Sequence, residues 1–189
     1  MSPERVPPTY WTLDEHNRKH SHSPPLARAL ERVLPAGVPV LDLGCGLGHY
    51  LASLREAGYR CRGVEGTPGI ASVSAFNNIV QADLSQPLSL DWPKSSILCL
   101  EVAEHLRPED EPRLLHTIDQ YCDEWLVLSW AVPGQGGHKH LNERPNSYVC
   151  HRFAERGFAF QAAEAFMLRE SIDRKAKWFR NTIMVFKRG

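Results

Sequence analysis

The sequence has no excess of charge of either sign. It contains 22 Lys and Arg residues and 22 Asp and Glu residues among 189, so its formal net charge is zero. Proteins that bind the phosphate backbone of nucleic acids usually have a clear excess of basic residues or a basic stripe on their surface. Here only the segment 174–188 is locally basic. The charge balance therefore argues against DNA or RNA as the main partner.

The sequence also lacks paired cysteines and long apolar runs. Its five cysteines are scattered, with no Cys-x-x-Cys spacing, which is typical of reduced thiols in the cytosol. The polar amino terminus has no apolar core of the kind found in signal peptides. No segment approaches the roughly 20 apolar residues that span a bilayer. We therefore expect a soluble, cytoplasmic protein without a membrane segment.

Strand and helix patterns alternate along most of the chain. We expect helices over residues 23–34, 49–57, 68–76, 112–122 and 147–156, and strands over residues 38–43, 60–64, 78–81, 96–100, 124–130, 158–166 and 179–187. This alternation predicts one α/β domain over residues 23–189, with a Rossmann-like doubly wound sheet of seven strands. The sheet should be mainly parallel, with one antiparallel strand near the C-terminus. Residues 1–22 would precede the domain as a lid or a flexible segment.

The most informative segment is VLDLGCGLG, residues 40–48. It predicts a buried strand that is followed at once by a glycine-rich turn and a helix. Glycines let the backbone turn sharply and approach a ligand closely, because they have no Cβ atom. Ligands of doubly wound sheets bind beyond the carboxyl ends of the strands. Gly44, Cys45 and Gly46 are therefore candidate ligand-binding residues.

Acidic residues stand at the ends of three successive predicted strands. They are Asp42, Glu65 and Asp83. Glu65 follows the glycine turn by roughly 20 residues, where a carboxylate can accept hydrogen bonds from both hydroxyls of a ribose. Asp83 is placed to accept from the amino group of an adenine. One such acid would be no more than a solvated side chain, but three around a glycine turn favour a nucleoside site.

Two classes of cofactor bind to a glycine-rich turn with an acidic residue at the next strand end, and the sequence must distinguish between them. Nicotinamide dinucleotides are bound by Gly-x-Gly-x-x-Gly, where the amino terminus of a helix holds the pyrophosphate. Here the spacing is Gly44-x-Gly46-x-Gly48, preceded by Asp42. A carboxylate beside this turn repels a pyrophosphate but suits the ammonium group of a methionine moiety. The pattern favours S-adenosylmethionine, with a nicotinamide-dependent oxidoreductase as the less favoured alternative.

These segments resemble the class I S-adenosylmethionine-dependent methyltransferases of the small-molecule type over residues 23–130 and into the closing strands. The matching motifs are LDLGCGLG (41–48), VEG (64–66), QADL (81–84) and CLEVAEHL (99–106). The resemblance implies that Gly66, Leu84 and Glu101 also contact the cofactor. Gly66 departs from the pattern, because many relatives have a larger residue there that covers one face of the adenine.

The same resemblance places Glu104 and His105 near the reacting methyl group, so both are catalytic candidates. The alternative is that His105 only packs locally. The sequence lacks the Asn/Asp-Pro-Pro-Tyr/Phe tetrapeptide of methyltransferases that act on nucleobase amino groups. We therefore expect O-, N- or S-methylation of a small molecule. A module that holds S-adenosylmethionine without turnover is the alternative from another functional class.

A long loop, residues 131–146, follows the fifth predicted strand on the edge where the cofactor is expected. Long loops that are rich in glycine and hydrogen-bonding groups are often functional. This one is similar to Pro-Gly-Gln-Gly-Gly-x-x-His-x-Asn loops in a subgroup of these enzymes. We expect His140 to act as a base or to orient the acceptor, because the near-neutral pKa of histidine suits proton removal. Gln135 and Asn142 would bind polar atoms of the acceptor; alternatively, all three only stabilise the loop.

Metal binding and a lid are two further questions that the sequence raises. His138 and His140 could ligate a metal together with Glu101, Glu104 or His105. A His-x-His pair arises easily by chance in a chain with nine histidines, so we expect no metal. Tyr10 and Trp11 favour a lid that contacts the acceptor over a polar, disordered tail.

Overall fold

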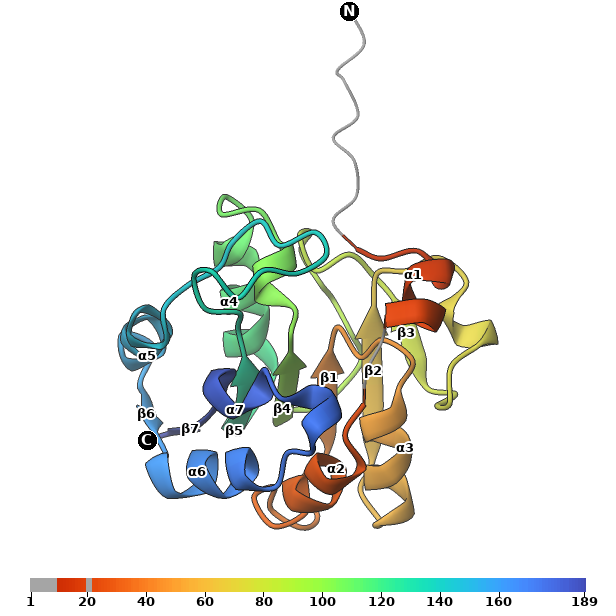
Figure 1. Cartoon of the computed structure of the whole chain (residues 1–189). Coiled ribbons are helices and arrows are strands. Elements are labelled where there is room, and N and C mark those ends of the chain that lie inside the picture. Colours follow the sequence, from red (N-terminus) through yellow and green to blue (C-terminus); the bar gives the residue numbers. More distant parts are fainter. Residues whose placement is uncertain (1–9, 20–21) are drawn as a thin grey trace, which may run out of the picture.

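A seven-stranded sheet forms the centre of the protein, and helices cover both of its faces (Figure 1). The computed structural model describes residues 10–19 and 22–189. Residues 1–9 and 20–21, which belong to the expected lid segment, lie outside the described residues. The strands are β1 Val40–Leu43, β2 Cys61–Glu65, β3 Ile79–Gln81, β4 Ser95–Leu100, β5 Cys122–Ser129, β6 Phe158–Phe160 and β7 Ile183–Arg188.

The order of the strands is β3-β2-β1-β4-β5-β7-β6. Strands β3 to β5 are parallel, whereas β7 pairs antiparallel with both β5 and β6. The predicted sheet, mainly parallel with one antiparallel strand near the C-terminus, is therefore confirmed. The strand order reverses between β1 and β4, so the chain leaves these neighbouring strands in opposite directions. Such a reversal opens a crevice at the carboxyl ends of the strands, where ligands of these folds bind.

Two helical layers enclose the sheet. The α-helices are α1 Leu13–Lys19, α2 Pro24–Leu30, α3 His49–Glu56, α4 Glu111–Tyr121, α5 Asn146–Ala154, α6 Ala162–Glu170 and α7 Phe179–Thr182. Three short 3₁₀ turns are η1 Ile70–Ser72, η2 Ala103–His105 and η3 Arg174–Ala176. Helices α2, α3, α6 and α7 pack on one face of the sheet, and α4 and α5 pack on the other (Figure 1).

The start of α2 shows how local sequence fixes an element. The Ser23 hydroxyl accepts a hydrogen bond from Leu26 N at 3.4 Å, which satisfies one of the free amide groups of the first turn. Pro24 fits the first helical position, where no amide donor is needed. Leu26 and Leu30 are fully buried, one helical turn apart on the same face. The predicted helix start is thus confirmed.

The helix expected over residues 68–76 is wrong. Only the short turn η1 forms there. Gly69 has a φ of +77°, and the Ser74 hydroxyl donates to Leu47 O and accepts from Phe76 N. Backbone groups here form hydrogen bonds with the Ser74 side chain in place of helical ones, so the helix does not continue.

The strands expected over residues 158–166 and 179–187 are only partly correct. Strand β6 ends at Phe160, and α6 follows with Ala165 and Leu168 buried three residues apart, while Phe166 is 65% exposed. This spacing is helical, although the apolar residues also fit a strand over a short window. In the last segment α7 comes first, and β7 begins at Ile183.

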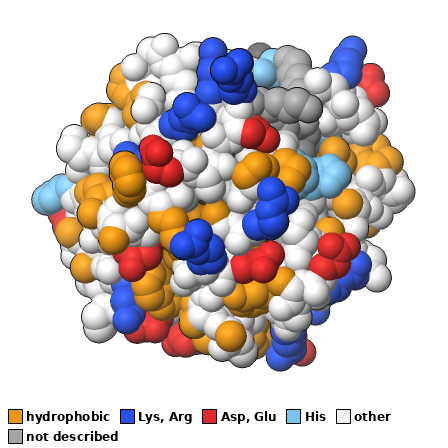
Figure 2. Space-filling view, turned by 60° about the horizontal axis from the view of Figure 1, so that its bottom comes forward, with side chains coloured by type: hydrophobic (Ala, Val, Ile, Leu, Met, Phe, Trp, Pro, Cys, Tyr) orange, Lys and Arg blue, Asp and Glu red, His pale blue; other side chains and the backbone are white. Residues whose placement is uncertain are grey.

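The surface carries both signs of charge. On the face that Figure 2 presents, acidic and basic side chains are interspersed and no stripe of one sign is seen. Among the described residues, no helix combines the length and the apolar character that crossing a membrane requires.

Candidate active site

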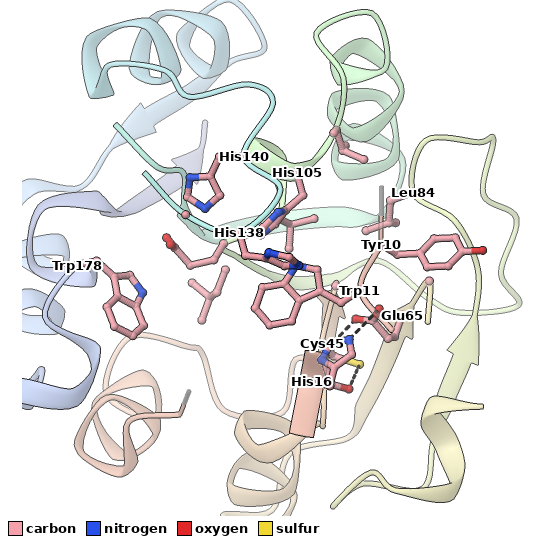
Figure 3. A pocket seen from close by; sticks show the side chains of 18 of the residues that line it. Tyr10, Trp11, His16, Cys45, Glu65, Leu84, His105, His138, His140 and Trp178 are labelled. Atoms are coloured by element: carbon pink, nitrogen blue, oxygen red, sulfur yellow. Dashed lines mark hydrogen bonds and ion pairs between the residues drawn. The ribbon is translucent and has the colours of Figure 1, made fainter. Parts of the chain in front are cut away.

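A cavity of about 680 Å³ lies at the carboxyl ends of β1, β2 and β4. Its walls come from the glycine-rich turn, from residues 10–16, from the loop after β5 and from α7 with the residues before it. In Figure 3, Tyr10 and Leu84 lie at one end of the cavity and Trp178 lies at the other, with His105 and His140 between them. The crevice predicted from the strand reversal is therefore present as a partly open cavity with two distinct ends.

Asp42 lies at the base of the glycine-rich turn. It is only 3% exposed, and it lines the cavity. Burial raises the pKa of its carboxyl to about 8, and the negative charge of Glu65 contributes to the same shift. Asp42 therefore keeps its proton at neutral pH and loses it readily when a cation approaches.

Glu65, at the end of β2, is held by several donors. Its Oε2 accepts from Gly46 N at 2.9 Å, and its Oε1 accepts from Thr67 N at 3.0 Å and from the Thr67 hydroxyl at 2.9 Å. His16 Nε2 lies 3.7 Å from Oε1. Burial acts to raise the pKa of Glu65, but the interactions with His16 and the two amides outweigh it and lower the pKa. Glu65 is thus ionised and fixed in position before any ligand binds.

Tyr10 occupies the space beside Gly66. A Cβ atom added to Gly66 would lie 2.9 Å from the Cβ and Cδ1 atoms of Tyr10. Asp83 and Leu84 line the same end of the cavity, where Asp83 Oδ1 accepts from Ser85 N at 2.8 Å. A side chain from the N-terminal segment therefore takes the place that a larger residue 66 would fill.

The N-terminal segment is attached to the loop after β5 through Glu15. Glu15 and Thr12 form a reciprocal cap at the start of α1, with Thr12 N donating to Glu15 Oε2 at 2.7 Å and Glu15 N donating to Thr12 Oγ1 at 3.3 Å. Glu15 also pairs with His138 and, at 3.0 Å, with Lys139 Nζ. The Thr12 amide and then His138 lower the pKa of Glu15. The carboxylate therefore stays charged and holds both segments together.

Trp11 forms the inner wall of this segment. Its ring centroid lies 5.6 Å from that of His105 and 6.0 Å from that of His138 (Figure 3). Its indole Nε1 is buried and has no hydrogen-bond partner in the part of the chain that the structure describes. Trp11 lines the cavity, although its indole nitrogen is covered by the surrounding residues.

Glu101 and Glu104 form a buried carboxyl pair after β4. Glu101 has a φ of +56°, which is uncommon outside glycine and occurs often at functional sites. Its Oε2 accepts from Gln135 Nε2 at 3.3 Å. Burial raises the pKa of both carboxyls, and Glu101 raises that of Glu104 further. Two adjacent buried carboxyls cannot both ionise without a counter-charge.

His105 and His140 face each other with ring centroids 5.1 Å apart. His105 Nδ1 lies 3.2 Å from Lys139 O, and His140 Nδ1 lies 3.0 Å from Glu143 Oε1. Burial lowers the pKa of His105 to about 4, so this ring is neutral at physiological pH. Its Nδ1 then carries the proton that the Lys139 carbonyl accepts.

A family model described as a methyltransferase domain matches residues 15–163. The chain belongs to this family. The predicted family and enzyme class are thereby confirmed. A comparison with curated proteins found no match.

Solved structures share the fold of this methyltransferase. The sugar N-methyltransferase KedS8 from Streptoalloteichus sp ATCC 53650 has a TM-score of 0.72 and 16% identity, covering 100% of this chain and 97% of that one. The CcbJ methyltransferase from Streptomyces caelestis has a TM-score of 0.68 and 14% identity, covering 93% and 95%. Magnesium protoporphyrin IX methyltransferase (ChlM) from Synechocystis PCC 6803 with bound SAM has a TM-score of 0.61 and 20% identity, covering 87% and 76%. At these identities the likeness concerns the fold.

The structure brings most of the predicted site residues together in the methyltransferase cavity. The expected cofactor contacts that line it are Asp42, Gly44, Cys45, Gly46, Glu65, Gly66, Asp83, Leu84 and Glu101. The expected acceptor-site residues that line it are Tyr10, Trp11, His105, Gln135 and His140.

Two predicted residues lie outside the lining. Glu104 is fully buried beside Glu101. Asn142 is 3% exposed, and its side-chain amide donates to Glu111 Oε2 at 3.1 Å. Asn142 stabilises the base of the loop, which is the alternative that the sequence left open, and we do not propose it as an acceptor contact.

Sequence analysis missed part of the lining. The segment from Lys177 to Asn181 was not predicted, and His16 was given no role of its own within the N-terminal segment. The aromatic pair Trp178-Phe179 was the available signal, but the strand expected over residues 179–187 concealed it. Because α7 turns these residues back toward the carboxyl ends of the strands, they close the far end of the cavity (Figure 1).

Proposed function

We propose that this methyltransferase transfers the methyl group of S-adenosylmethionine to a small-molecule acceptor. One observation carries the proposal: Asp42, Glu65 and Asp83 stand at successive strand ends and line one cavity around the glycine-rich turn. This arrangement suits an adenosine that is joined to an amino acid.

Each carboxylate is assigned to one polar part of the cofactor. Glu65 would accept from the ribose hydroxyls, and its tie to Gly46 N keeps it facing the turn. Asp83 would accept from the adenine amino group. Asp42 would pair with the methionine ammonium, and the raised pKa of its carboxyl means that cofactor binding releases a proton near neutral pH.

Tyr10 is proposed to cover one face of the adenine. The contact between Tyr10 and Gly66 supports this role, since no side chain at position 66 is present to do so. Residues 10–19 would then form a lid that must open for the cofactor to enter, and Glu15 would hold it closed.

The other end of the cavity is proposed to hold the acceptor. A volume of about 680 Å³ lies within the usual range of roughly 300–1,000 Å³ for small-molecule sites, and it must hold both cofactor and acceptor. His140 is assigned as the base or the orienting group, Gln135 is assigned to polar atoms of the acceptor, and the Trp11 side chain is assigned to a wall of the acceptor site. The acceptor lone pair forms the new bond to the methyl carbon while the carbon–sulfur bond breaks and its electron pair stays on sulfur.

Calorimetric titration tests the cofactor half of the proposal. We expect S-adenosylhomocysteine and S-adenosylmethionine to bind with one-to-one stoichiometry and NAD to give no specific heat. Saturable binding of NAD in place of both sulfur nucleosides would overturn the assignment.

A transfer assay tests the catalytic half. The enzyme is incubated with methyl-labelled S-adenosylmethionine and fractions of a small-molecule extract. We expect label in a low-molecular-weight product, and a rate about 10²–10⁴-fold lower for His140→Ala, the usual effect of losing a general base. Cofactor binding without transfer to any fraction would instead favour a non-catalytic module.

A further inference from the structure

We propose that Glu104, His105 and His140 bind a divalent transition-metal ion at the acceptor end of the cavity. This inference rests on the proposed function, because the metal would serve the methyl transfer. Of the two roles proposed for His140 it selects the orienting one, because a ring that uses Nδ1 toward Glu143 and Nε2 for a metal cannot also accept a proton. One ligand atom from each of the three residues lies within 4.8 Å of the others. Figure 3 shows His105 and His140 side by side at the cavity, although they come from η2 and from the loop after β5.

The two imidazoles are oriented as metal ligands usually are. Metal-binding histidines typically donate one ring N–H to a carboxylate or a backbone carbonyl, which leaves the other nitrogen free for the ion. His105 uses Nδ1 toward Lys139 O, and His140 uses Nδ1 toward Glu143 Oε1. Within the described residues, neither Nε2 has a hydrogen-bond partner. Both rings therefore keep Nε2 available.

The loop is built to hold His140 in this position. Glu143, the partner of His140, accepts from Gly134 N and Gly136 N, each at 2.8 Å. A Cβ atom on Gly137 would lie 2.1 Å from His140 Nε2. Because an added Cβ atom would overlap the imidazole ring, only glycine at position 137 permits this position of His140.

Glu104 supplies the next argument for a cation. Its side chain is 0% exposed, and neither carboxyl oxygen has a hydrogen-bond partner of good geometry among the described residues, although the Glu101 carboxyl and the amides of Glu104 and Ala131 act on its pKa. A buried carboxyl without donors destabilises the folded protein, so it requires a partner. Lys139 does not supply the charge, because its Nζ binds Glu15 and Tyr10 O. A metal ion would satisfy Glu104 and the two imidazoles together.

The donor set indicates the class of ion and its role. Two imidazoles and one carboxylate suit Zn²⁺, Mn²⁺, Fe²⁺ or Co²⁺ and leave coordination positions open. A hydroxyl of the acceptor would occupy an open position, where its pKa falls. It loses its proton to solvent, and its oxygen forms the bond to the methyl carbon as the carbon–sulfur bond breaks. The chemical class of acceptor that fits is therefore a hydroxyl compound.

The sequence alone favoured no metal, since a His-x-His pair in a loop is weak evidence. In the structure the candidate ligands are not His138 and His140 but Glu104, His105 and His140. His138 binds Glu15 and lies outside the cluster, whereas His105 and the buried Glu104 join His140.

Metal binding is measured directly on the full chain after chelator treatment and dialysis. We expect one Zn²⁺ per chain by calorimetry, and visible Co²⁺ bands without the near-ultraviolet band of cobalt–thiolate bonds. Glu104→Gln, His105→Ala and His140→Ala should each weaken binding at least about tenfold. His151→Ala, on the exposed side of α5, and His138→Ala should bind as the wild type does. Equal affinity in the three cluster variants, or a cobalt–thiolate spectrum, would overturn the proposal.

Binding of S-adenosylhomocysteine is measured on the same variants to keep the two proposals apart. We expect the three cluster variants to keep wild-type affinity for it, which also shows that they are folded. Nucleoside binding without metal binding would remove the metal site and leave the proposed function intact. Metal binding without nucleoside binding would overturn the proposed function and leave the metal site in place.

Discussion

Two buried carboxyl groups, one that lines the cavity and one that lies behind its lining, have opposite surroundings. Glu65, at the end of β2, accepts from Gly46 N, from Thr67 N and from the Thr67 hydroxyl. Glu104, at the acceptor end, is equally buried, yet neither of its oxygens has a hydrogen-bond partner of good geometry among the described residues. Glu65 already has hydrogen-bond donors in the ligand-free protein, so a ligand adds to an existing network. Glu104 keeps an unmet requirement, so the acceptor end is complete only when another group binds there.

The largest expected effect concerns Asp42, a third buried carboxyl, which lines the same cavity as Glu65. Its native pKa of about 8 exceeds the ordinary value of 3.8. The native state therefore binds this proton more tightly than the unfolded state, and the associated stability is fully present below about pH 4. It is lost as the pH rises toward 8, at up to about 1.4 kcal/mol per pH unit. The Asp42→Asn variant has no ionisable carboxyl at this position, so its stability does not have this dependence on pH.

Denaturant unfolding of the ligand-free protein at several pH values measures this effect. The unfolding free energy of Asp42→Asn minus that of the wild type should grow between about pH 4 and pH 8 and then level off. A constant difference over this range would mean that Asp42 titrates normally.

Glu65→Ala comes next in size. We expect the affinity for S-adenosylhomocysteine to fall by about 1–3 kcal/mol, because ribose hydroxyls would be left without an acceptor. Asn142→Ala is the matched control, since Asn142 is also buried and hydrogen-bonded but lies outside the cavity. The control should lower the unfolding free energy and leave the affinity unchanged. Equal losses of affinity in both variants would contradict the assignment of Glu65.

Tyr10→Ala should weaken S-adenosylhomocysteine binding by about 0.5–1.5 kcal/mol, the scale of one aromatic stacking contact. Gly66→Ala should weaken binding in the wild type, because the added Cβ meets Tyr10 at 2.9 Å. In the Tyr10→Ala background the same substitution should cost less, because the contact with Tyr10 Cδ1 is removed and only the contact with the Cβ atom of residue 10 remains. Additive effects in this double-mutant cycle would show that the two positions do not depend on each other.

Glu15→Gln should give the smallest effect. It keeps the helix cap, which glutamine can also form, but it removes the charge that holds His138 and Lys139. We expect S-adenosylhomocysteine to dissociate up to about fivefold faster, since ion pairs that solvent still reaches contribute roughly 1 kcal/mol or less. Stopped-flow tryptophan fluorescence measures the rate. Asp14→Asn, which changes the neighbouring exposed acid, should leave it unchanged.

The cofactor end could be predicted from the sequence, because it depends on strand ends alone. Once residues 40–43 and 61–65 are strands of one parallel sheet, Asp42 and Glu65 must meet at the same edge. The glycine spacing then selects the ligand class. No long-range packing information is needed for this part of the site.

The acceptor end could be predicted only in outline. His140 was singled out, but its approach to His105 depends on how a long loop folds back onto η2. Asn142 belongs to the same motif, yet its side chain turns to Glu111 instead of the cavity. The segment from Lys177 to Asn181 was missed because short apolar stretches fit helix and strand equally well. Loop conformation and tertiary packing decide these positions, and neither has a local sequence period.

The double attachment of Glu15 has a consequence for the catalytic cycle. The same carboxylate caps α1 and binds two neighbouring residues of the loop that carries His140. Any movement that lifts α1 to release the spent nucleoside must either break these ion pairs or carry the loop with it. In the proposed catalytic cycle, a lid that carries the loop with it would couple departure of the demethylated cofactor to release of the methylated product.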